Sequence, residues 1–213
     1  MQYSFTQVDK HLYRIQVDTD YTNFIPMLES AKWDKETSFI GDYLAVSNLR
    51  KHNTPKPLLE YKNFFANQTQ FKDDLISTMF ENEIFQQKNT EDRQTIMSKT
   101  EIISSWIKTP GQYTQGFVHT DRHTPYVHGL IYMIQGNDPN QSTWFAKYDD
   151  PQDVPDNLYP FETGIGIGWI VVATNRSWHR ALNATDHARY CLKISLDPIN
   201  SDFVDEYKRL FIK

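Results

Sequence analysis

Three residues of this sequence could together hold a metal ion: His119, Asp121 and His179. His119 and Asp121 stand two positions apart, so on an extended segment both side chains point to the same face. One strand end can then offer two ligands to one metal, and a second strand has to supply His179. Two imidazoles and one carboxylate can bind Fe(II) on one face and leave positions open for a co-substrate and dioxygen. The alternative is that His119 and Asp121 form a polar turn and that His179 is a hydrogen-bonded core histidine.

Arg189 follows His179 by ten residues, in the segment ARYCLKISL. A guanidinium is a permanent cation that can grip a carboxylate with two parallel hydrogen bonds, so we expect Arg189 to hold a dicarboxylate. Lys193 is a rival cation, because strand alternation puts it on the same face as Arg189, together with Cys191 and Ser195. The alternative for Arg189 is a structural ion pair with a carboxylate.

With this pattern the chain resembles the Fe(II)/2-oxoglutarate-dependent dioxygenase superfamily, whose pattern is HxD…H followed by an arginine that binds 2-oxoglutarate. The segment TPGQYTQGFVHTD at 109–121 is similar to the prolyl 4-hydroxylase-like branch, where a Pro-Gly turn precedes the HxD. The segment LIYMI at 130–134 resembles the following core strand, on which a tyrosine often hydrogen-bonds the co-substrate, and Tyr132 is the matching position. Tyr132 could equally be a core aromatic whose hydroxyl has a protein partner.

Two positions depart from the pattern of this superfamily. Asn140-Gln141-Ser142-Thr143 replaces a glycine pair that the prolyl 4-hydroxylase-like branch often has. Cys191 stands where the superfamily often has a serine, whose hydroxyl would help to bind the carboxylate.

The resemblance implies a non-heme Fe(II)- and 2-oxoglutarate-dependent oxygenase. His119, Asp121 and His179 would be the catalytic metal ligands, Arg189 and Tyr132 would bind 2-oxoglutarate, and dioxygen would be the oxidant. Hydroxylation of an aliphatic C–H of a small molecule or an amino-acid residue is favoured, because related halogenases have a small residue in place of Asp121. Two other classes stay open: a cupin-like metalloenzyme that does not use 2-oxoglutarate, and a non-catalytic jelly roll that binds a carbohydrate or a protein.

Composition restricts the partners. The 213 residues carry a formal net charge of −5 and are 14% aromatic, and no run of clustered Lys/Arg is present. A nucleic-acid groove would need a basic stripe, so a nucleic-acid substrate is disfavoured and a small-molecule or amino-acid substrate is favoured. A single cysteine indicates a reducing compartment. We see no signal peptide and no apolar run of membrane-spanning length, so we expect a cytoplasmic protein without a membrane partner.

Periodicity separates the chain into two parts. Short apolar runs between turns predict strands over 101–108, 109–121, 126–134, 142–148, 164–174, 177–182 and 188–196. The run at 126–134 is apolar on both faces, as in a strand that is buried on both sides. Before residue 100 we expect strands at 12–17 and 39–46, helices at 23–33 and 70–87, and a loop at 50–57. A last helix begins near Asn200 or Ser201.

This order predicts a mainly β protein with flanking helices (α+β) and a double-stranded β-helix, or jelly-roll, core. We expect residues 1–213 to form a single domain. In it, 1–100 would be a mixed, partly helical part that braces the core, 101–197 the jelly roll and 198–213 a C-terminal helix.

Several other residues near these motifs need an interpretation. His123, His128 and His187 lack a partner at metal-ligand spacing and are not expected to bind metal. Gly164, Gly166 and Gly168 alternate, which leaves one strand face bare for another backbone to pack closely. We expect the mouth of the pocket to be built from Trp106, Tyr113, Trp144 and the loops at 50–57 and 149–160.

Overall fold

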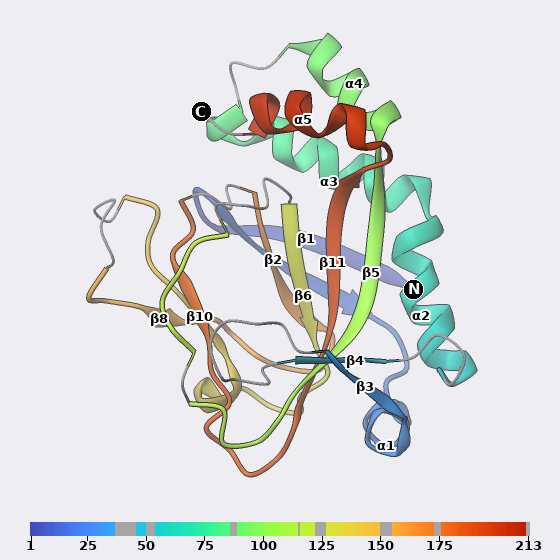
Figure 1. The fold of residues 1–213 in the computed structure, drawn as a ribbon, viewed down its shortest axis with the longest axis vertical. Helices are drawn as coiled ribbons and strands as arrows, with labels where there is room; N and C mark the ends of the chain where they lie inside the picture. The colour runs from blue at the N-terminus through green and yellow to red at the C-terminus, as the bar shows by residue number, and fades with distance from the viewer. Residues whose placement is uncertain are drawn as a thin grey trace.

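The computed structural model describes residues 1–36, 46–49, 54–85, 89–114, 116–121, 127–149, 155–172 and 176–211. Within these ranges the strands form one large and one small antiparallel sheet, with helices packed beside the large sheet (Figure 1). The predicted mainly β fold with flanking helices is therefore confirmed. The large sheet has the spatial order β1 (Gln2–Asp9), β2 (Leu12–Asp18), β9 (Ile167–Val171), β6 (Val127–Tyr132), β11 (Arg189–Pro198), β5 (Thr100–Thr109), β4 (Val46–Leu49) and β3 (Trp33–Glu36).

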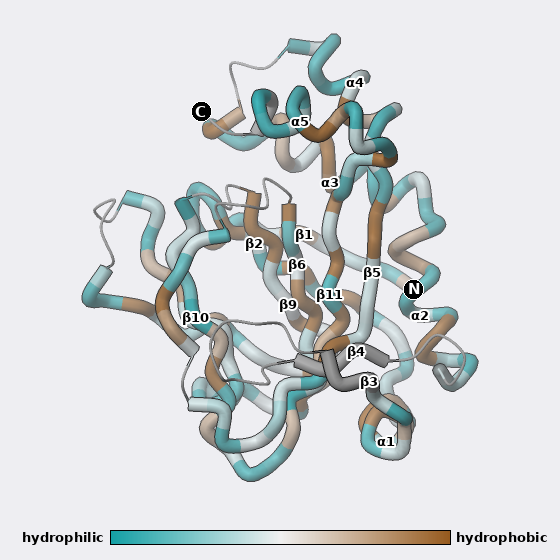
Figure 2. The backbone as a smooth tube through the Cα atoms, viewed as in Figure 1, coloured by the Kyte–Doolittle hydropathy of each residue, from teal (hydrophilic) through white to brown (hydrophobic). Residues whose placement is uncertain are grey.

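The large sheet has two faces that differ in what covers them. On its outer face Leu192, Ile194 and Leu196 of β11 pack with Trp106 of β5 against helices. On its inner face Leu130 and Tyr132 of β6 pack with Trp169 of β9 in a second apolar cluster, to which the small sheet adds Phe145. All six residues of β6 are buried, as expected for a strand with both faces covered. Figure 2 accordingly shows apolar residues along the central strands.

Helices supply the other half of the outer core. Helix α2 (Lys56–Asn67) places Leu58, Tyr61 and Phe65 on one stripe, and α3 (Thr69–Glu81) adds Phe71 and Met79. Spacings of three and four residues put these side chains on one helix face, which is why they can all reach the sheet. No helix of the described residues is both long and apolar enough to cross a membrane. The remaining helical segments are α1 (Phe24–Ser30), η2 (Glu83–Phe85), α4 (Thr90–Lys99), η3 (Pro139–Gln141), η4 (Ser201–Phe203) and α5 (Val204–Phe211).

The first hundred residues contain more structure than expected. Strand β1 was not predicted, and β1 and β2 extend the large sheet itself. Helices α2 and α4 were also missed; α2 begins at Lys56, inside the predicted loop at 50–57. The predicted helix at 70–87 ends at Glu81, because the Asn82 side chain donates to the Lys10 carbonyl and the Tyr13 hydroxyl and the chain turns there. The strand predicted at 39–46 lies outside the described residues except for Val46.

The small sheet faces the inner side of the large one and has the order β10 (His179–Ala181), β7 (Thr143–Phe145) and β8 (Tyr159–Pro160). The strand predicted over 109–121 is irregular: in its described part only Tyr113 and His119 form isolated bridges, to Asn183 and His179. Through these bridges the segment runs beside β10. The two sheets therefore enclose an interior to which both contribute side chains, as in a jelly roll.

Gly168 explains how β9 fits into the large sheet. A Cβ built on this glycine would lie 2.0 Å from the Leu130 carbonyl oxygen of β6, far inside contact distance. The close backbone approach expected from the alternating glycines is thus present at Gly168.

Candidate metal centre and anion pocket

The predicted metal ligands lie together at one end of the interior. His119 and His179 exchange both backbone hydrogen bonds, each 2.9 Å long. Their side chains therefore point to the same side from two neighbouring segments of the chain. The Asp121 carboxylate reaches both rings: Oδ1 lies 3.7 Å from Nε2 of His119 and Oδ2 lies 3.7 Å from Nε2 of His179. One ligand atom from each of the three residues lies within 4.8 Å of the others. Two imidazoles and a carboxylate at this separation can hold one divalent transition metal ion.

Hydrogen bonds fix both imidazoles in the form that a metal needs. Nδ1 of His119 lies 3.0 Å from the Phe117 carbonyl oxygen, and Nδ1 of His179 lies 2.8 Å from the Ser177 carbonyl oxygen. Because a carbonyl can only accept, each Nδ1 carries the proton and each Nε2 presents its lone pair. Metal-binding histidines are commonly oriented in this way. Burial lowers the pKa of His179, an effect that Asp121 opposes in part.

Close packing positions the HxD segment against β10. A Cβ on Gly116 would lie 2.1 Å from the Ala181 carbonyl oxygen, so only glycine allows the chain to pass at this distance. Three residues later the chain delivers His119, whose ring lies 4.4 Å from that of His179 between centroids. Gly116 is a position that supports the candidate site and that sequence reasoning missed, although the glycine before the HxD was visible in the sequence.

Arg189 lies in the interior, away from solvent. It is only 1% exposed, and among the described residues no carboxylate forms an ion pair with it. Its Nη1 donates to the Leu182 carbonyl at 3.3 Å and its Nη2 to the Thr143 hydroxyl at 3.2 Å, whereas Nε has no hydrogen-bond partner. A buried charge is normally paired, because an unpaired one is costly to desolvate. The expected alternative of a structural ion pair thus finds no support, and the guanidinium is suited to a carboxylate ligand.

The aromatic ring of Tyr132 packs against the Arg189 guanidinium. The Arg189 Cζ lies 5.2 Å from the centroid of the Tyr132 ring. The Tyr132 hydroxyl donates to Thr143 Oγ1 at 3.1 Å and accepts from the Thr143 backbone N–H and from Trp169 Nε1, at 3.0 and 3.2 Å. Protein groups therefore already engage the hydroxyl, and Tyr132 holds Thr143 beside Arg189.

Thr143 is a second residue of the candidate site that sequence reasoning missed. The expected place for a hydroxyl beside the arginine was Cys191, whose thiol is buried and has its pKa raised by burial, with Arg189 opposing the shift. The structure instead brings the Thr143 hydroxyl from the small sheet. The sequence did offer one indication, because Thr143 belongs to the segment Asn140–Thr143 that stands in place of the glycine pair.

Two further histidines lie near the triad. His128, on the inner face of β6, is buried, and burial lowers its pKa to about 4. Lys193 lowers this pKa further, and Asp121 raises it. His11, in the turn between β1 and β2, is fully buried and was not singled out from the sequence. Burial lowers the pKa of His11 to about 4 as well, and its ring lies 5.6 Å from that of Tyr148. Neither ring belongs to the three-residue cluster.

The remaining expectations have mixed outcomes. Trp106 was wrongly placed at the mouth: it is 2% exposed on the outer face, stacked on Tyr61. Tyr113 does lie near the anion pocket, since Arg189 acts on its pKa, which burial raises. Trp144 holds the cation of Arg180 over its ring at 5.3 Å. His187 is exposed, as expected. His123 lies outside the described residues, as do parts of both mouth loops.

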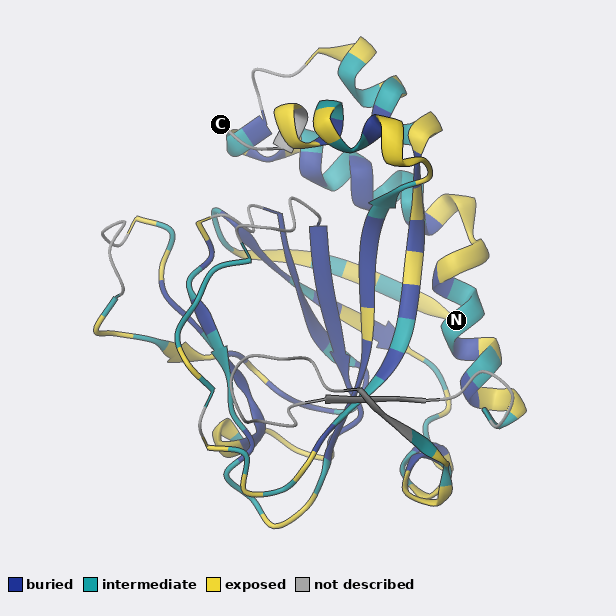
Figure 3. Cartoon of the chain, viewed as in Figure 1, coloured by how far each residue is buried: buried dark blue, intermediate teal, exposed yellow. Residues whose placement is uncertain are grey.

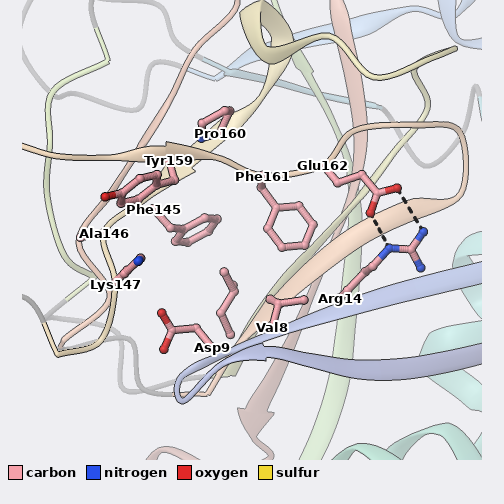
Figure 4. Close-up of a pocket in the computed structure, with 11 residues that line it drawn as sticks. Val8, Asp9, Arg14, Phe145, Ala146, Lys147, Tyr159, Pro160, Phe161 and Glu162 are labelled. Atoms are coloured by element: carbon pink, nitrogen blue, oxygen red, sulfur yellow. Dashed lines mark hydrogen bonds and ion pairs between the residues drawn. The ribbon is translucent and has the colours of Figure 1, made fainter.

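A separate pocket of about 280 Å³ lies where β8 approaches the β1–β2 hairpin (Figure 4). Phe145, Phe161 and Leu12 line it with apolar surface, and an ion pair of 2.7 Å between Arg14 and Glu162 closes one end. No residue of the metal-binding triad lines it. Phe145 nevertheless connects the two regions, because its ring also lies 5.6 Å from that of His179.

Comparison with solved structures gives the architecture a name. A prolyl hydroxylase from Trichoplax adhaerens, in complex with a peptide fragment of the hypoxia inducible factor oxygen degradation domain, superposes with a TM-score of 0.57 at 9% identity, covering 99% of this chain and 87% of that one. EvdO2 from Micromonospora carbonacea var. aurantiaca, complexed with 2-oxoglutarate, gives 0.52 at 11% identity over 92% and 94%. The fold is that of the 2-oxoglutarate-dependent oxygenases and prolyl hydroxylases.

A prolyl 4-hydroxylase from Phytophthora capsici extends the same likeness, with a TM-score of 0.51 at 12% identity over 95% of this chain and 68% of that one. No protein-family model matches the sequence, and no curated protein is significantly similar to it. The resemblance drawn from HxD…H…R is thus confirmed in the fold, and a His-Asp-His cluster occupies the predicted positions.

Proposed function

We propose that this protein is a non-heme Fe(II)- and 2-oxoglutarate-dependent oxygenase that hydroxylates an aliphatic C–H. The observation that carries the proposal is Arg189, a buried guanidinium with no carboxylate partner in the part of the chain that the structure describes, in the same interior as His119, Asp121 and His179. A cupin-like metalloenzyme that does not use 2-oxoglutarate would have no need of such a cation.

In this proposal His119, Asp121 and His179 hold Fe(II), and the donor set suits the ion because two neutral nitrogens and one carboxylate leave coordination positions open. Bound iron with 2-oxoglutarate supplies the oxidising power, and dioxygen is the oxidant. The protein contributes orientation: carbonyl oxygens hold both imidazoles in place, and the partly exposed Asp121 keeps the metal side accessible. Retention of a carboxylate at 121 favours hydroxylation, since it occupies the ligand position that a halide would need.

Arg189 would neutralise the distal carboxylate of 2-oxoglutarate. The Thr143 hydroxyl, which accepts from Arg189 and Tyr132, would donate its own proton to the same carboxylate. Tyr132 would support this site from below, because its hydroxyl is hydrogen-bonded to Thr143 and its ring lies under the guanidinium. The low polarity around Arg189 strengthens the attraction between the two charges.

A small molecule or a single amino-acid residue is the proposed class of substrate. The net charge of −5 and the absence of clustered cations disfavour nucleic acid, whose phosphates need several basic contacts. The buried rings of Phe145 and Trp169 lie 5.6 and 6.4 Å from that of His179, so one side of the triad is apolar, as in sites for compact organic substrates.

Anaerobic titration with Fe(II), with and without 2-oxoglutarate, tests the proposal. We expect an absorption band that requires both iron and 2-oxoglutarate, and that the His179→Ala variant does not develop. Exposure to oxygen should then release succinate. Iron binding without a 2-oxoglutarate-dependent band would favour the cupin-like alternative, and no iron binding at all would favour a non-catalytic jelly roll.

A further inference from the structure

The inner face of the large sheet carries a second cation that the proposed chemistry does not use. Lys193 lies four residues beyond Arg189 on β11, which separates the two along the strand by roughly 13 Å. It is the exposed position in a strand that is otherwise buried from Arg189 to Leu196, and Figure 3 shows this interruption in β11. Two cations on one face at this separation can bind two different anionic groups.

Strand register connects Lys193 to the candidate metal-binding triad through one row of cross-strand neighbours. Lys193 is opposite Leu130 of β6, and Leu130 is opposite Trp169 of β9. The Trp169 ring lies 6.4 Å from that of His179. Arg189, in contrast, lies over the ring of Tyr132. Tyr132 is opposite Cys191, which is the inner-face position of β11 between Arg189 and Lys193. The effect of Lys193 on the pKa of the inner-face residue His128 agrees with this placement.

Around Lys193 lies a row of residues that we call the inner shelf: Ile103, Ser105, His128, Lys193 and Ser195. Ile103 and Lys193 are exposed, Ser105 is half-buried, and His128 and Ser195 are buried beneath them. Ser105 and Ile103 of β5 are opposite Lys193 and Ser195, so the row continues across the sheet. Ile103 is 45% exposed, in a part of β5 that the pairing with β4 at Ile107 and Lys108 does not reach. An exposed isoleucine beside serine hydroxyls and a lysine provides both apolar contact and polar recognition.

Lys193 has no anionic partner among the residues whose positions the structure describes. Among the described residues Lys193 forms no ion pair and no hydrogen bond, although the chain has 27 acidic residues against 22 basic ones. Asp197 is the second inner-face position after Lys193 on β11. Burial raises the pKa of the Asp197 carboxyl and Lys193 lowers it, but the two residues do not form an ion pair. The ammonium is therefore available to a ligand.

We infer that Lys193 on the inner shelf binds an anionic group, a carboxylate or a phosphate, of the substrate that is oxidised at the metal. The inference rests on the proposed function and narrows its substrate to small molecules that carry a negative charge and an apolar part. Arg189 and Lys193 then have separate tasks: the buried cation holds the co-substrate, and the exposed one selects the substrate.

Matched probes test this assignment. Hexanoate, hexyl phosphate and hexanamide share an alkyl chain and differ in charge, and their dissociation constants can be measured by ligand-observed NMR on protein that contains Fe(II) and saturating 2-oxoglutarate without oxygen. Wild type should bind an anionic probe about two- to fivefold more tightly than hexanamide, as expected for one partly solvated charge pair. The stronger of the two anions identifies the group. Broadening of the probe signals by iron should accompany binding.

Variants make the outcome specific. Lys193→Gln should remove the preference for the anion, Lys193→Glu should invert it in favour of hexylamine, and Lys208→Gln, at an exposed lysine of α5, should leave it unchanged. The absorption band of iron with 2-oxoglutarate should persist in all three variants. Equal binding of all probes by wild type, or loss of 2-oxoglutarate affinity in Lys193→Gln, would overturn the assignment. A missing absorption band in wild type would instead refute the proposed function.

Discussion

Arg189 lies on the large sheet, whereas the candidate metal-binding triad lies at the small sheet, with His179 on β10 and His119 and Asp121 on the segment beside it. Arg189 begins a ten-residue strand with hydrogen-bonded neighbours on both sides and is 1% exposed. His119 and Asp121 sit on an irregular segment, and their side chains are 30% and 33% exposed. A cation that holds a carboxylate is more effective when it is desolvated, whereas a metal that reacts with dioxygen and substrate has to stay accessible. The large sheet suits the first requirement and the irregular segment with His119 and Asp121 suits the second, whereas His179 on β10 is itself 11% exposed.

The largest effect is expected on the small sheet. His179→Ala should abolish tight Fe(II) binding, because it removes one of the three proposed ligands. The protein should still fold, because the large outer core contains no residue of the triad. Iron binding can be measured by anaerobic titration and folding by circular dichroism. His187→Ala, at an exposed histidine in the turn before β11, is the matched control and should bind iron like wild type. Retention of tight iron binding by His179→Ala would remove this residue from the ligand set.

On the large sheet the strongest functional effect should come from Arg189. Arg189→Ala should weaken 2-oxoglutarate binding by about 2–5 kcal/mol, the usual cost of truncating one partner of a buried charge pair. Titration of the 2-oxoglutarate-dependent absorption band measures this, and Fe(II) affinity alone should change little. Lys193→Ala serves as control. If Lys193→Ala weakened 2-oxoglutarate more than Arg189→Ala did, the roles of the two cations would be exchanged.

A core substitution separates stability from chemistry. Leu192→Ala, at a fully buried position on the outer face of β11, should lower the free energy of unfolding by about 2–5 kcal/mol. Urea unfolding gives this value, and His179→Ala measured in the same way without metal should lose far less. Iron binding by folded Leu192→Ala should resemble wild type. Comparable losses of stability in both variants would contradict the division of tasks between the sheets.

The smallest expected effect is on the pH dependence of stability, through His11 in the β1–β2 turn, which packs on Tyr148. Burial lowers the pKa of His11 to about 4 from its ordinary value of 6.5. Between these values the unfolded chain binds a proton that the folded protein does not, so stability falls as the pH falls through this window. The loss should reach at most about 3 kcal/mol. His11→Phe should lose less stability than wild type between pH 7 and pH 4.5 in urea unfolding; an identical loss would speak against a neutral His11.

Much of the inner architecture follows from local pattern. Strands β2, β6 and β11 were predictable because two-residue alternation or continuous apolar runs survive in them. The triad was predictable because its three residue types are rare in combination, although the HxD segment proved irregular. Helix α2 was missed despite a regular spacing of Leu58, Tyr61 and Phe65, because a Pro-containing polar segment precedes it.

Contacts between the sheets were harder to foresee. Thr143 reaches Arg189 from a position 46 residues away in sequence, and no local pattern encodes that pairing. Trp106 was placed at the mouth because aromatic residues often line pockets. Its register with Leu192 instead turns it to the outer face, and the pairing that decides this belongs to another strand. Which face of a strand is buried is a property of the assembled sheet.

The carbonyl oxygens behind the two imidazoles have a consequence for proton balance. Each Nδ1 proton is already committed to a carbonyl, and burial keeps the pKa of His179 below its ordinary value. Near neutral pH His179 therefore carries no proton on Nε2 that an incoming cation would have to displace. Metal uptake at this ligand should release no acid into the solvent, and its contribution to the heat of binding should be the same in buffers of different ionisation enthalpy. At an exposed histidine, protons compete with the metal near the ordinary pKa of the imidazole. At His179 the same competition should begin only at lower pH.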